Sequence, residues 1–215
     1  MTRRFLCVLG SSRPGGNSEM LAGAAAEQLP EGVEQRWLDL AEHPLPDFED
    51  LRHDSDHVRP AGDNRALLLD ATLAATDLVI VSPLYWYSVS AHVKRYLDHW
   101  SGWLRTPGLD FKKNMAGRTL RGVTALAHYE EEIAEPLIGT LNHSAAYMGM
   151  LPHCLKGVGG TPIGGVLLGN GSKPGDVLRD TAALTRAKTF LTEPREAPFA
   201  RFPYDSDEAA ARARH

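Results

Sequence analysis

The sequence predicts an α/β fold in which five parallel strands form a doubly wound open sheet with helices on both faces. Three largely apolar runs, at residues 4–9, 77–82 and 120–126, have the length and composition of strands that are buried on both sides. Segments with apolar residues three and four positions apart lie between these runs, as in helices that connect parallel strands. Because such crossovers are right-handed, we expect helices on both faces of the sheet.

The first half of the chain contains three of the expected strands. In order, we expect a strand at residues 4–9, a helix at 20–29, a strand at 33–40, a helix at 65–75 and a strand at 77–82. Pro30 ends the first helix because proline cannot continue one. Residues 41–64 are rich in Pro, Asp and His and are expected to form a long surface loop. His53 and His57 lie four apart in this loop, but no helical pattern brings them together, so no metal site is predicted.

The second half of the chain contains the remaining strands and three helices. In order, we expect a helix at residues 88–104, a strand at 120–126, a helix at 133–148, a strand between 151 and 158 and a helix at 176–191, with Asp176 as its N-cap. The apolar run at 166–168 is expected to be a short edge strand. Residues 193–215 contain three prolines and alternating charges, which is typical of an irregular tail. We therefore expect one domain at residues 1–192 and an irregular tail at 193–215.

The composition is that of an ordinary globular protein, with 43% hydrophobic and 23% charged residues. A formal net charge of -4 gives no reason to expect nucleic-acid binding. No stretch approaches the roughly 20 apolar residues that a membrane-spanning helix needs, so a cytoplasmic protein without a membrane span is expected. Cys7 and Cys154 lie in apolar segments and are expected to be reduced packing thiols.

Residues 10–18, with the sequence GSSRPGGNS, form a polar loop between the first strand and the first helix. A helix start carries unpaired N–H groups and roughly half a positive charge, so small residues there favour phosphate binding. The loop adds hydrogen-bond donors and a cation in Ser11, Ser12, Arg13, Asn17 and Ser18. It lacks the Gly-Lys-Ser/Thr of an ATP-binding P-loop, and position 12, where a dinucleotide fingerprint has glycine, is serine. The loop therefore predicts a site for another kind of phosphate, with a plain strand-to-helix turn as the alternative.

A second distinctive loop, residues 83–88, follows the strand at 77–82. Pro83 stiffens its backbone, and large aromatic faces come from Tyr85, Trp86 and Tyr87. In a doubly wound sheet, loops that follow strands lie at the carboxyl edge, where ligands bind. Packing in the core or against another subunit would also account for the aromatic side chains. Beside a phosphate loop on the same edge, they favour a site for a flat ring.

These loops resemble those of the flavodoxin-like NAD(P)H-dependent FMN reductase and quinone reductase superfamily. The similarity rests on residues 10–18, on residues 82–91 (SPLYWYSVSA) and on the following helix with Lys94 and Asp98, and it covers most of residues 3–191. In that superfamily the first loop holds the FMN phosphate, a role that maps here onto Ser11, Arg13, Asn17 and Ser18. The second loop lines the isoalloxazine ring, a role that maps here onto Pro83, Leu84, Tyr85, Trp86 and Tyr87. The resemblance implies a flavodoxin-like fold.

The loop after the fourth strand departs from the superfamily pattern. The superfamily often has a glycine pair here, whereas residues 127–130 read AHYE. Related quinone reductases place Tyr and His residues near the flavin in this region, so the resemblance implies His128 and Tyr129 as candidate catalytic residues. An exposed loop edge is the alternative for this segment.

The resemblance implies an oxidoreductase in which FMN takes electrons from NAD(P)H and passes them to a small acceptor such as a quinone by a ping-pong route, with FAD, which some quinone-reductase relatives use, as the alternative cofactor. The cofactor performs the redox step, so no side-chain nucleophile is required. Members of the superfamily commonly form homodimers or homotetramers, to which Trp100 and Trp103 could contribute unless they belong to the core. A flavodoxin-type electron carrier is the alternative, although such carriers are usually more acidic than -4 implies. A chain that has lost flavin and serves as an interaction module is a third possibility.

Overall fold

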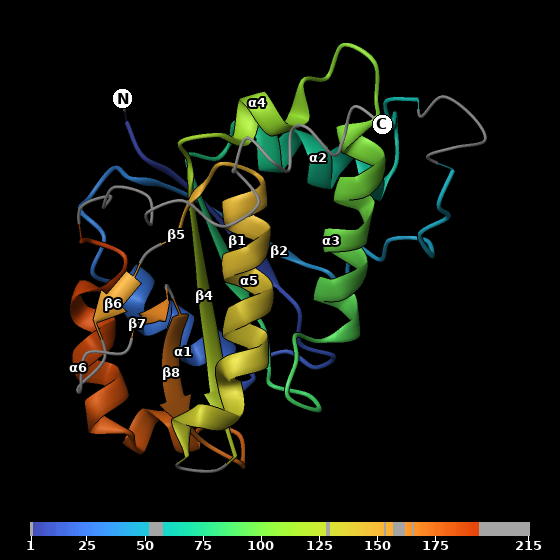
Figure 1. The fold of residues 1–215 in the computed structure, drawn as a ribbon. Helices are drawn as coiled ribbons and strands as arrows, with labels where there is room; N and C mark the ends of the chain where they lie inside the picture. Colours follow the sequence, from blue (N-terminus) through green and yellow to red (C-terminus); the bar gives the residue numbers. More distant parts are fainter. Residues whose placement is uncertain are drawn as a thin grey trace.

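The computed structural model describes residues 2–51, 58–127, 130–152, 154–156, 162–164 and 166–193. Figure 1 shows the strands of this part of the chain in a central layer, with helices on either side. The strands of the sheet, taken across it from one edge, are β2 (Glu34–Asp39), β1 (Arg4–Leu9), β3 (Asp77–Val81), β4 (Thr119–Leu126) and β5 (Leu151–Pro152). All neighbouring pairs in this order are parallel. The doubly wound, flavodoxin-like sheet that the sequence predicts is therefore confirmed.

The sheet is covered on both faces because its central strands are apolar on both sides. In β1, Leu6 and Val8 belong to one hydrophobic core, whereas Phe5, Cys7 and Leu9 belong to the other. On the first face lie α2 (Asn64–Ala74), α3 (Ala91–Leu104), α4 (Phe111–Met115) and α5 (Glu135–Tyr147). On the second face lie α1 (Asn17–Ala26) and α6 (Thr181–Phe190), which pack against each other. Because successive side chains of a strand point to opposite faces of the sheet, each central strand contributes to two separate cores.

The fifth position of the sheet is filled by two separate segments. β5 pairs only with the start of β4 and ends at Pro152, which has no N–H to continue the hydrogen-bonded ladder. β8 (Val166–Asn170) pairs in parallel with the rest of β4, starting at Gly122. The expectation of a single strand between residues 151 and 158 was therefore wrong in its extent. The apolar run at 166–168, expected as a short edge strand, forms the longer part of this edge.

A small antiparallel sheet stands between these two segments in the chain. It consists of β6 (Cys154–Lys156) and β7 (Pro162–Gly164).

β8 and α5 pack closely against β4 at Gly122, where a Cβ would lie 2.6 Å from Leu141 Cδ1 and 2.9 Å from Val166 Cγ2. The absence of a side chain at Gly122 therefore lets the edge strand and the helix approach β4 together.

The first core contains a cluster of aromatic rings that includes Trp100 and Trp103, which are 4% and 3% exposed. Phe111 packs edge-to-face against both, with ring centroids 5.7 and 5.3 Å away, and Tyr96 packs against the same two indoles. Phe111 lies in α4, a helix too short for its periodicity to be recognised in the sequence. Both tryptophans are thus core residues, and any subunit contact must use another surface.

The last helix begins later than predicted. A 3₁₀ turn, η2 (Asp176–Arg179), precedes α6, and the side chain of Asp180 caps α6 by accepting a hydrogen bond from the Ala183 N–H. Asp176 is therefore not the N-cap of α6. A second 3₁₀ turn, η1 (Glu131–Ala134), leads into α5. No helix in the part of the chain described above is long and apolar enough to cross a membrane.

Candidate functional site

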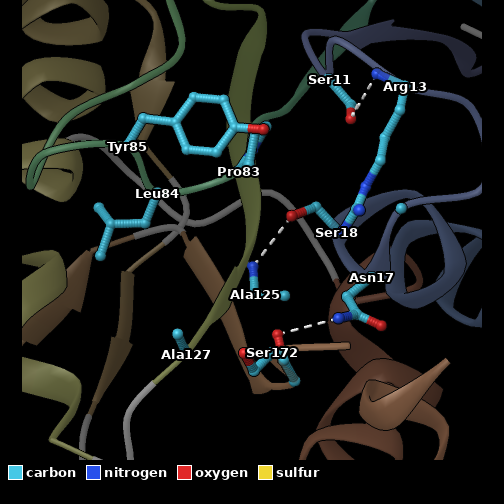
Figure 2. Close-up of a pocket in the computed structure, with 12 residues that line it drawn as sticks. Ser11, Arg13, Asn17, Ser18, Pro83, Leu84, Tyr85, Ala125, Ala127 and Ser172 are labelled. Atoms are coloured by element: carbon cyan, nitrogen blue, oxygen red, sulfur yellow. Dashed lines mark hydrogen bonds between the residues drawn. The ribbon is translucent and has the colours of Figure 1, made fainter. Parts of the chain in front are cut away.

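A pocket lies at the carboxyl ends of β1, β3, β4 and β8, where the loops that follow these strands converge (Figure 2). Its walls are formed by Ser11, Arg13, Gly16, Asn17, Ser18, Pro83, Leu84, Tyr85, Ala125, Ala127, Gly171 and Ser172. Figure 2 shows Leu84 and Tyr85 on one side and Ser11 and Arg13 on the other. The predicted edge of the sheet therefore carries the pocket, as is usual for doubly wound folds.

The start of α1 forms the polar side of the pocket. Its N-cap is Gly16, and no side chain caps this helix. By contrast, α2, α3 and α6 are capped by side chains that accept a hydrogen bond from the helix backbone, namely those of Asp63, Ser90 and Asp180. The first N–H groups of α1 carry partial positive charge and lie beside the Arg13 guanidinium on the pocket wall. This side of the pocket can therefore receive an anion.

The loop that leads into α1 is shaped by local hydrogen bonds. The Arg13 N–H donates to Ser11 Oγ at 3.2 Å, and the Gly15 N–H donates to Glu19 Oε2 at 2.8 Å. Gly15 has a φ of +64°, a conformation that most side chains disfavour. A Cβ on Gly16 would lie 3.3 Å from Ser11 Oγ, which is tight contact. The loop is thus folded into a compact turn whose backbone stays close to the pocket.

Ser18 ties α1 to two strand ends beneath the pocket. Its side chain is buried, and Oγ donates to the Ser82 carbonyl at 3.2 Å and accepts from the Ala125 N–H at 3.0 Å. Ser82 follows β3 directly, and Ala125 lies near the end of β4. The hydroxyl therefore fixes the start of α1 relative to both strands.

The side chain of Asn17 makes its hydrogen bonds to the segment that follows β8. Nδ2 donates to the carbonyls of Gly171 and Lys173 at 2.9 and 2.8 Å, and Oδ1 accepts from the Gly175 N–H at 2.9 Å. Sequence reasoning did not include Gly171 and Ser172 in the site. The signal was available, since a strand at 166–170 would place the next loop at the same sheet edge.

The apolar side of the pocket comes from the loop after β3. Pro83, Leu84 and Tyr85 line it, and Leu84 also packs against the first core. A Cβ on Gly10 would lie 2.3 Å from Val93 Cγ2, so this glycine allows α3 to approach the end of β1. The two loops that the sequence singles out are thereby brought together around one cavity.

Trp86 and Tyr87 lie at the tip of a tight turn and do not line the pocket. Tyr85 and Ser88 exchange two backbone hydrogen bonds of 3.1 Å across the turn. Both central residues have left-handed backbones, with φ of 49° for Trp86 and 65° for Tyr87. Trp86 is 94% exposed. Two bulky residues in this conformation place strain on the backbone. Because the indole of Trp86 is exposed, its burial does not offset this strain.

The third part of the wall is the end of β4, where Ala125 and Ala127 present small side chains. His128 and Tyr129, the candidate catalytic residues, come next in the chain and lie outside the described residues, as do His53 and His57. Among the residues that the structure describes, no group of three His, Cys, Asp or Glu side chains could hold a metal ion. The described wall therefore joins an anion-binding side to an apolar, aromatic side, a combination that suits a flat ring carrying a phosphate.

Comparison with known proteins agrees with this geometry. The family model described as NADPH-dependent FMN reductase matches residues 3–152. YwqN of Bacillus subtilis, a protein named as an NAD(P)H-dependent FMN-containing oxidoreductase, is 31% identical over 189 residues, which cover 87% of this chain and 96% of YwqN.

Solved structures show the same fold. The Trp repressor binding protein from Bacillus subtilis is 26% identical, with a TM-score of 0.65 over 90% of this chain and 100% of the other. An NAD(P)H:quinone oxidoreductase from Methanothermobacter marburgensis is 17% identical, with a TM-score of 0.56 over 87% of this chain and 96% of the other. At that identity the second likeness is one of fold.

Proposed function

The chain belongs to the NADPH-dependent FMN reductase family and is an NAD(P)H-dependent oxidoreductase of that type, and from this premise we propose that the pocket in Figure 2 is its FMN site. The observation that carries the proposal is the division of the pocket into a polar side at the start of α1 and an apolar side at Pro83, Leu84 and Tyr85. FMN has the same division, with a phosphate at one end and a flat ring at the other. The residues present therefore fit the cofactor.

In this proposal the phosphate lies at the uncapped start of α1. Backbone N–H groups of the first turn and the Ser11 hydroxyl donate hydrogen bonds to it, and Arg13 neutralises part of its charge. Ser18 supports the phosphate site indirectly, because its hydroxyl bonds to Ser82 and Ala125 and so fixes the start of α1. A ligand with one terminal phosphate satisfies this cradle, which supports FMN over FAD.

The loop after β3 orients the ring. Pro83 restricts the backbone, Leu84 and Tyr85 give an apolar surface, and the small side chains of Ala125 and Ala127 leave space beside β4. When bound, FMN accepts two electrons from NAD(P)H and passes them to a second substrate. The protein's own contribution is to bind and orient the ring while keeping one side of the pocket open to each substrate in turn.

We further propose a quinone or a similar small molecule as the acceptor, bound in turn with NAD(P)H by a ping-pong route. Tyr85, Trp86 and Tyr87 are 46%, 94% and 57% exposed, so aromatic faces stand at the same loop as the ring site. Initial rates measured at several NADPH and quinone concentrations should give parallel double-reciprocal lines. Intersecting lines would contradict a ping-pong route.

The absorbance spectrum of the purified protein, followed by identification of the released flavin, is the direct test of the FMN site. We expect a bound flavin that is FMN, and bleaching of its absorbance on rapid mixing with NADPH. A protein that binds FMN without bleaching would instead be a flavodoxin-type electron carrier. A colourless protein that takes up no FMN would contradict both and support an interaction module.

His128 and Tyr129 stay candidates for positions beside the acceptor. The variant His128→Ala, compared with the unchanged protein at equal flavin content, should lower quinone turnover while leaving FMN affinity in place. An unchanged turnover rate would remove the proposed role. Assembly as a homodimer or homotetramer also stays a prediction, which light scattering of the purified protein measures directly.

A further inference from the structure

We infer that Asn17 is a positioning residue whose side chain holds the segment at residues 171–177 in place, so that Gly171 and Ser172 of that segment can form part of the wall of the cofactor pocket. The inference rests on the proposed function only for the identity of the bound molecule. That Asn17 holds the segment at residues 171–177 does not depend on which molecule is bound. The predicted role of Asn17 as a phosphate ligand through its side chain is thereby replaced by a role through its contacts with this segment.

The Asn17 amide is fully engaged within the protein. An asparagine side chain offers two N–H donors and one oxygen with two lone pairs. Here both donors are used by the carbonyls of Gly171 and Lys173, and the oxygen accepts from the N–H groups of Gly175 at 2.9 Å and Val177 at 3.4 Å. The residue is only 7% exposed. No hydrogen-bonding capacity of the Asn17 side chain is left for a ligand, so its role is to hold residues 171–177 in place.

Gly171 is held between β4 and Asn17. Its N–H donates to the Leu126 carbonyl at 2.8 Å, and its own carbonyl accepts from Asn17. A Cβ at this position would lie 2.7 Å from Asn17 Nδ2 and 2.8 Å from the Val177 N. Such distances are too short for a side chain, so only glycine allows the segment to lie this close to the start of α1.

The held segment contributes directly to the pocket. Gly171 and Ser172 both line it, and Figure 2 shows Ser172 beside Asn17, below Ala125. Ser172 adds a hydroxyl to this wall of the pocket, whose other polar side chains belong to the loop at residues 10–18 and to Tyr85. The Asn17 amide therefore organises the cofactor site through the segment it holds, in addition to the backbone N–H that Asn17 gives to the helix start.

The variant Asn17→Ala tests the inference, with Asn114→Ala as its matched control. Asn114 lies in α4 and also donates from Nδ2 to a carbonyl, that of Leu109 at 2.8 Å, but it does not line the pocket. Hydrogen exchange of residues 169–178 is measured on the full-length protein, as purified and after flavin removal. FMN affinity is measured by titration of the flavin-free protein.

For Asn17→Ala we expect faster exchange in the 169–178 segment and FMN affinity lower by about tenfold, as for the loss of one to two hydrogen bonds that shape a site. Asn114→Ala should change neither quantity. Gly171→Ala, which pushes the segment away from Asn17 while keeping the amide, should reproduce both effects. It serves as the second variant if Asn17→Ala does not fold.

Three outcomes would overturn the inference. Unchanged exchange in the 169–178 segment, whatever the FMN affinity, means that Asn17 does not hold it. Faster exchange with unchanged FMN affinity means that the segment is no part of the cofactor site. Equal effects in Asn114→Ala mean that the changes are unspecific. Failure of the unchanged protein to bind FMN would contradict the proposed function, while the exchange data still decide whether Asn17 holds the segment.

Discussion

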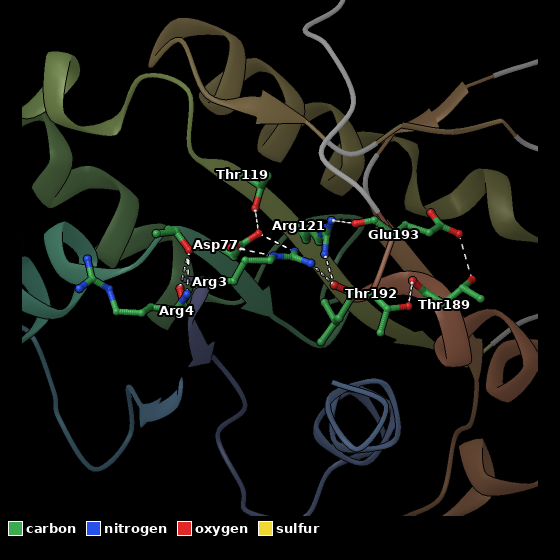
Figure 3. Close-up of polar contacts among 10 residues, drawn as sticks. Arg3, Arg4, Asp77, Thr119, Arg121, Thr189, Thr192 and Glu193 are labelled. Atoms are coloured by element: carbon green, nitrogen blue, oxygen red, sulfur yellow. Dashed lines mark hydrogen bonds and ion pairs between the residues drawn. The ribbon is translucent and has the colours of Figure 1, made fainter. Parts of the chain in front are cut away.

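Arg3 and Asp77 form a two-point ion pair at the end of the sheet away from the pocket (Figure 3): Nη2 of Arg3 lies 2.7 Å from Oδ1, and Nε lies 3.3 Å from Oδ2. Asp77 is fully buried, and Thr119 and Thr76 donate further hydrogen bonds to its carboxylate. Burial alone raises the pKa of Asp77, but the hydrogen bonds from Arg3 and the two threonines, with the Arg3 charge, outweigh it. The pKa therefore lies well below its usual range.

Asp77→Asn should lower the free energy of unfolding by about 3 kcal/mol near neutral pH, because it leaves the Arg3 guanidinium facing a neutral amide. Since the pKa of Asp77 is lower in the folded than in the unfolded chain, the stability that the carboxylate contributes is complete above about pH 4 and is lost as the pH falls further. Urea unfolding of both proteins near pH 7 and near pH 3 measures the difference.

The control for this experiment is Asp70→Asn. It breaks an exposed ion pair of the same 2.7 Å length, with Arg59, and should cost less than about 1 kcal/mol at either pH. A stability difference for Asp77→Asn that stays constant between the two pH values would contradict the assigned role of the carboxylate.

Arg13→Ala should weaken FMN binding by about tenfold at low salt, because an exposed guanidinium on the pocket wall attracts the phosphate. The loss should shrink as salt is added, since salt screens exposed charges. Titration of the flavin-free protein at two ionic strengths measures both effects. Arg36→Ala, which removes an exposed arginine of β2 that does not line the pocket, should leave FMN affinity unchanged. Equal losses in the two variants would point to net charge rather than a specific contact.

Replacing the turn residues Trp86 and Tyr87 by Asn and Gly should stabilise the protein by about 1 kcal/mol, because Asn-Gly adopts the left-handed conformation with little strain. We expect the same double variant to lose catalytic efficiency with quinones, because it removes two exposed aromatic side chains from the loop that carries the proposed ring site. Urea unfolding and steady-state kinetics give the two values. Leu178→Asn removes another exposed apolar side chain, and it should relieve no strain. Lower stability of the double variant would contradict the assignment of strain.

Cys7 should resist alkylation in the folded protein. It is buried within β1, and burial raises the pKa of its thiol to about 12, so the reactive thiolate is scarce near pH 8. Treatment with iodoacetamide near pH 8, followed by mass analysis of the peptide that contains Cys7, should show modification in urea and none without it. Rapid labelling of the native protein would mean that β1 opens readily to solvent.

The fold could be predicted because its strongest signals are local. The run from Asp77 to Val81 is buried at every position, and its composition alone marks it as a central strand. The fifth strand was harder to predict, because residues 151–158 and 166–168 both contain apolar residues that could belong to an edge strand. The choice between them depends on which backbone pairs with β4 beyond Gly122, and that pairing joins distant parts of the chain.

The candidate site followed the same rule. Ser11, Arg13, Pro83 and Tyr85 could be predicted to lie together because they belong to loops that directly follow predicted strands, and all four line one pocket. The role of the Asn17 amide was missed because its partner Gly171 lies 154 residues away in the sequence.

Arg121 shows the same limit at the far end of the sheet. Its buried guanidinium in β4 donates to the carbonyls of Leu191 and Glu193, which follow α6, and Figure 3 shows the contact with Glu193. The apolar strand pattern around Arg121 does not predict that contact. The pattern depends on residues that are close in the sequence, whereas the contact joins residues that are far apart in it.

The division of the sheet edge between β5 and β8 also affects the nascent chain during its synthesis on the ribosome. Until residues 166–170 have been synthesised, the edge of β4 from Gly122 to Leu126 has no strand to pair with. Unpaired edges recruit strands from neighbouring chains, so a nascent chain at this stage is prone to self-association. Pairing of β8 with β4 ends that period of exposure.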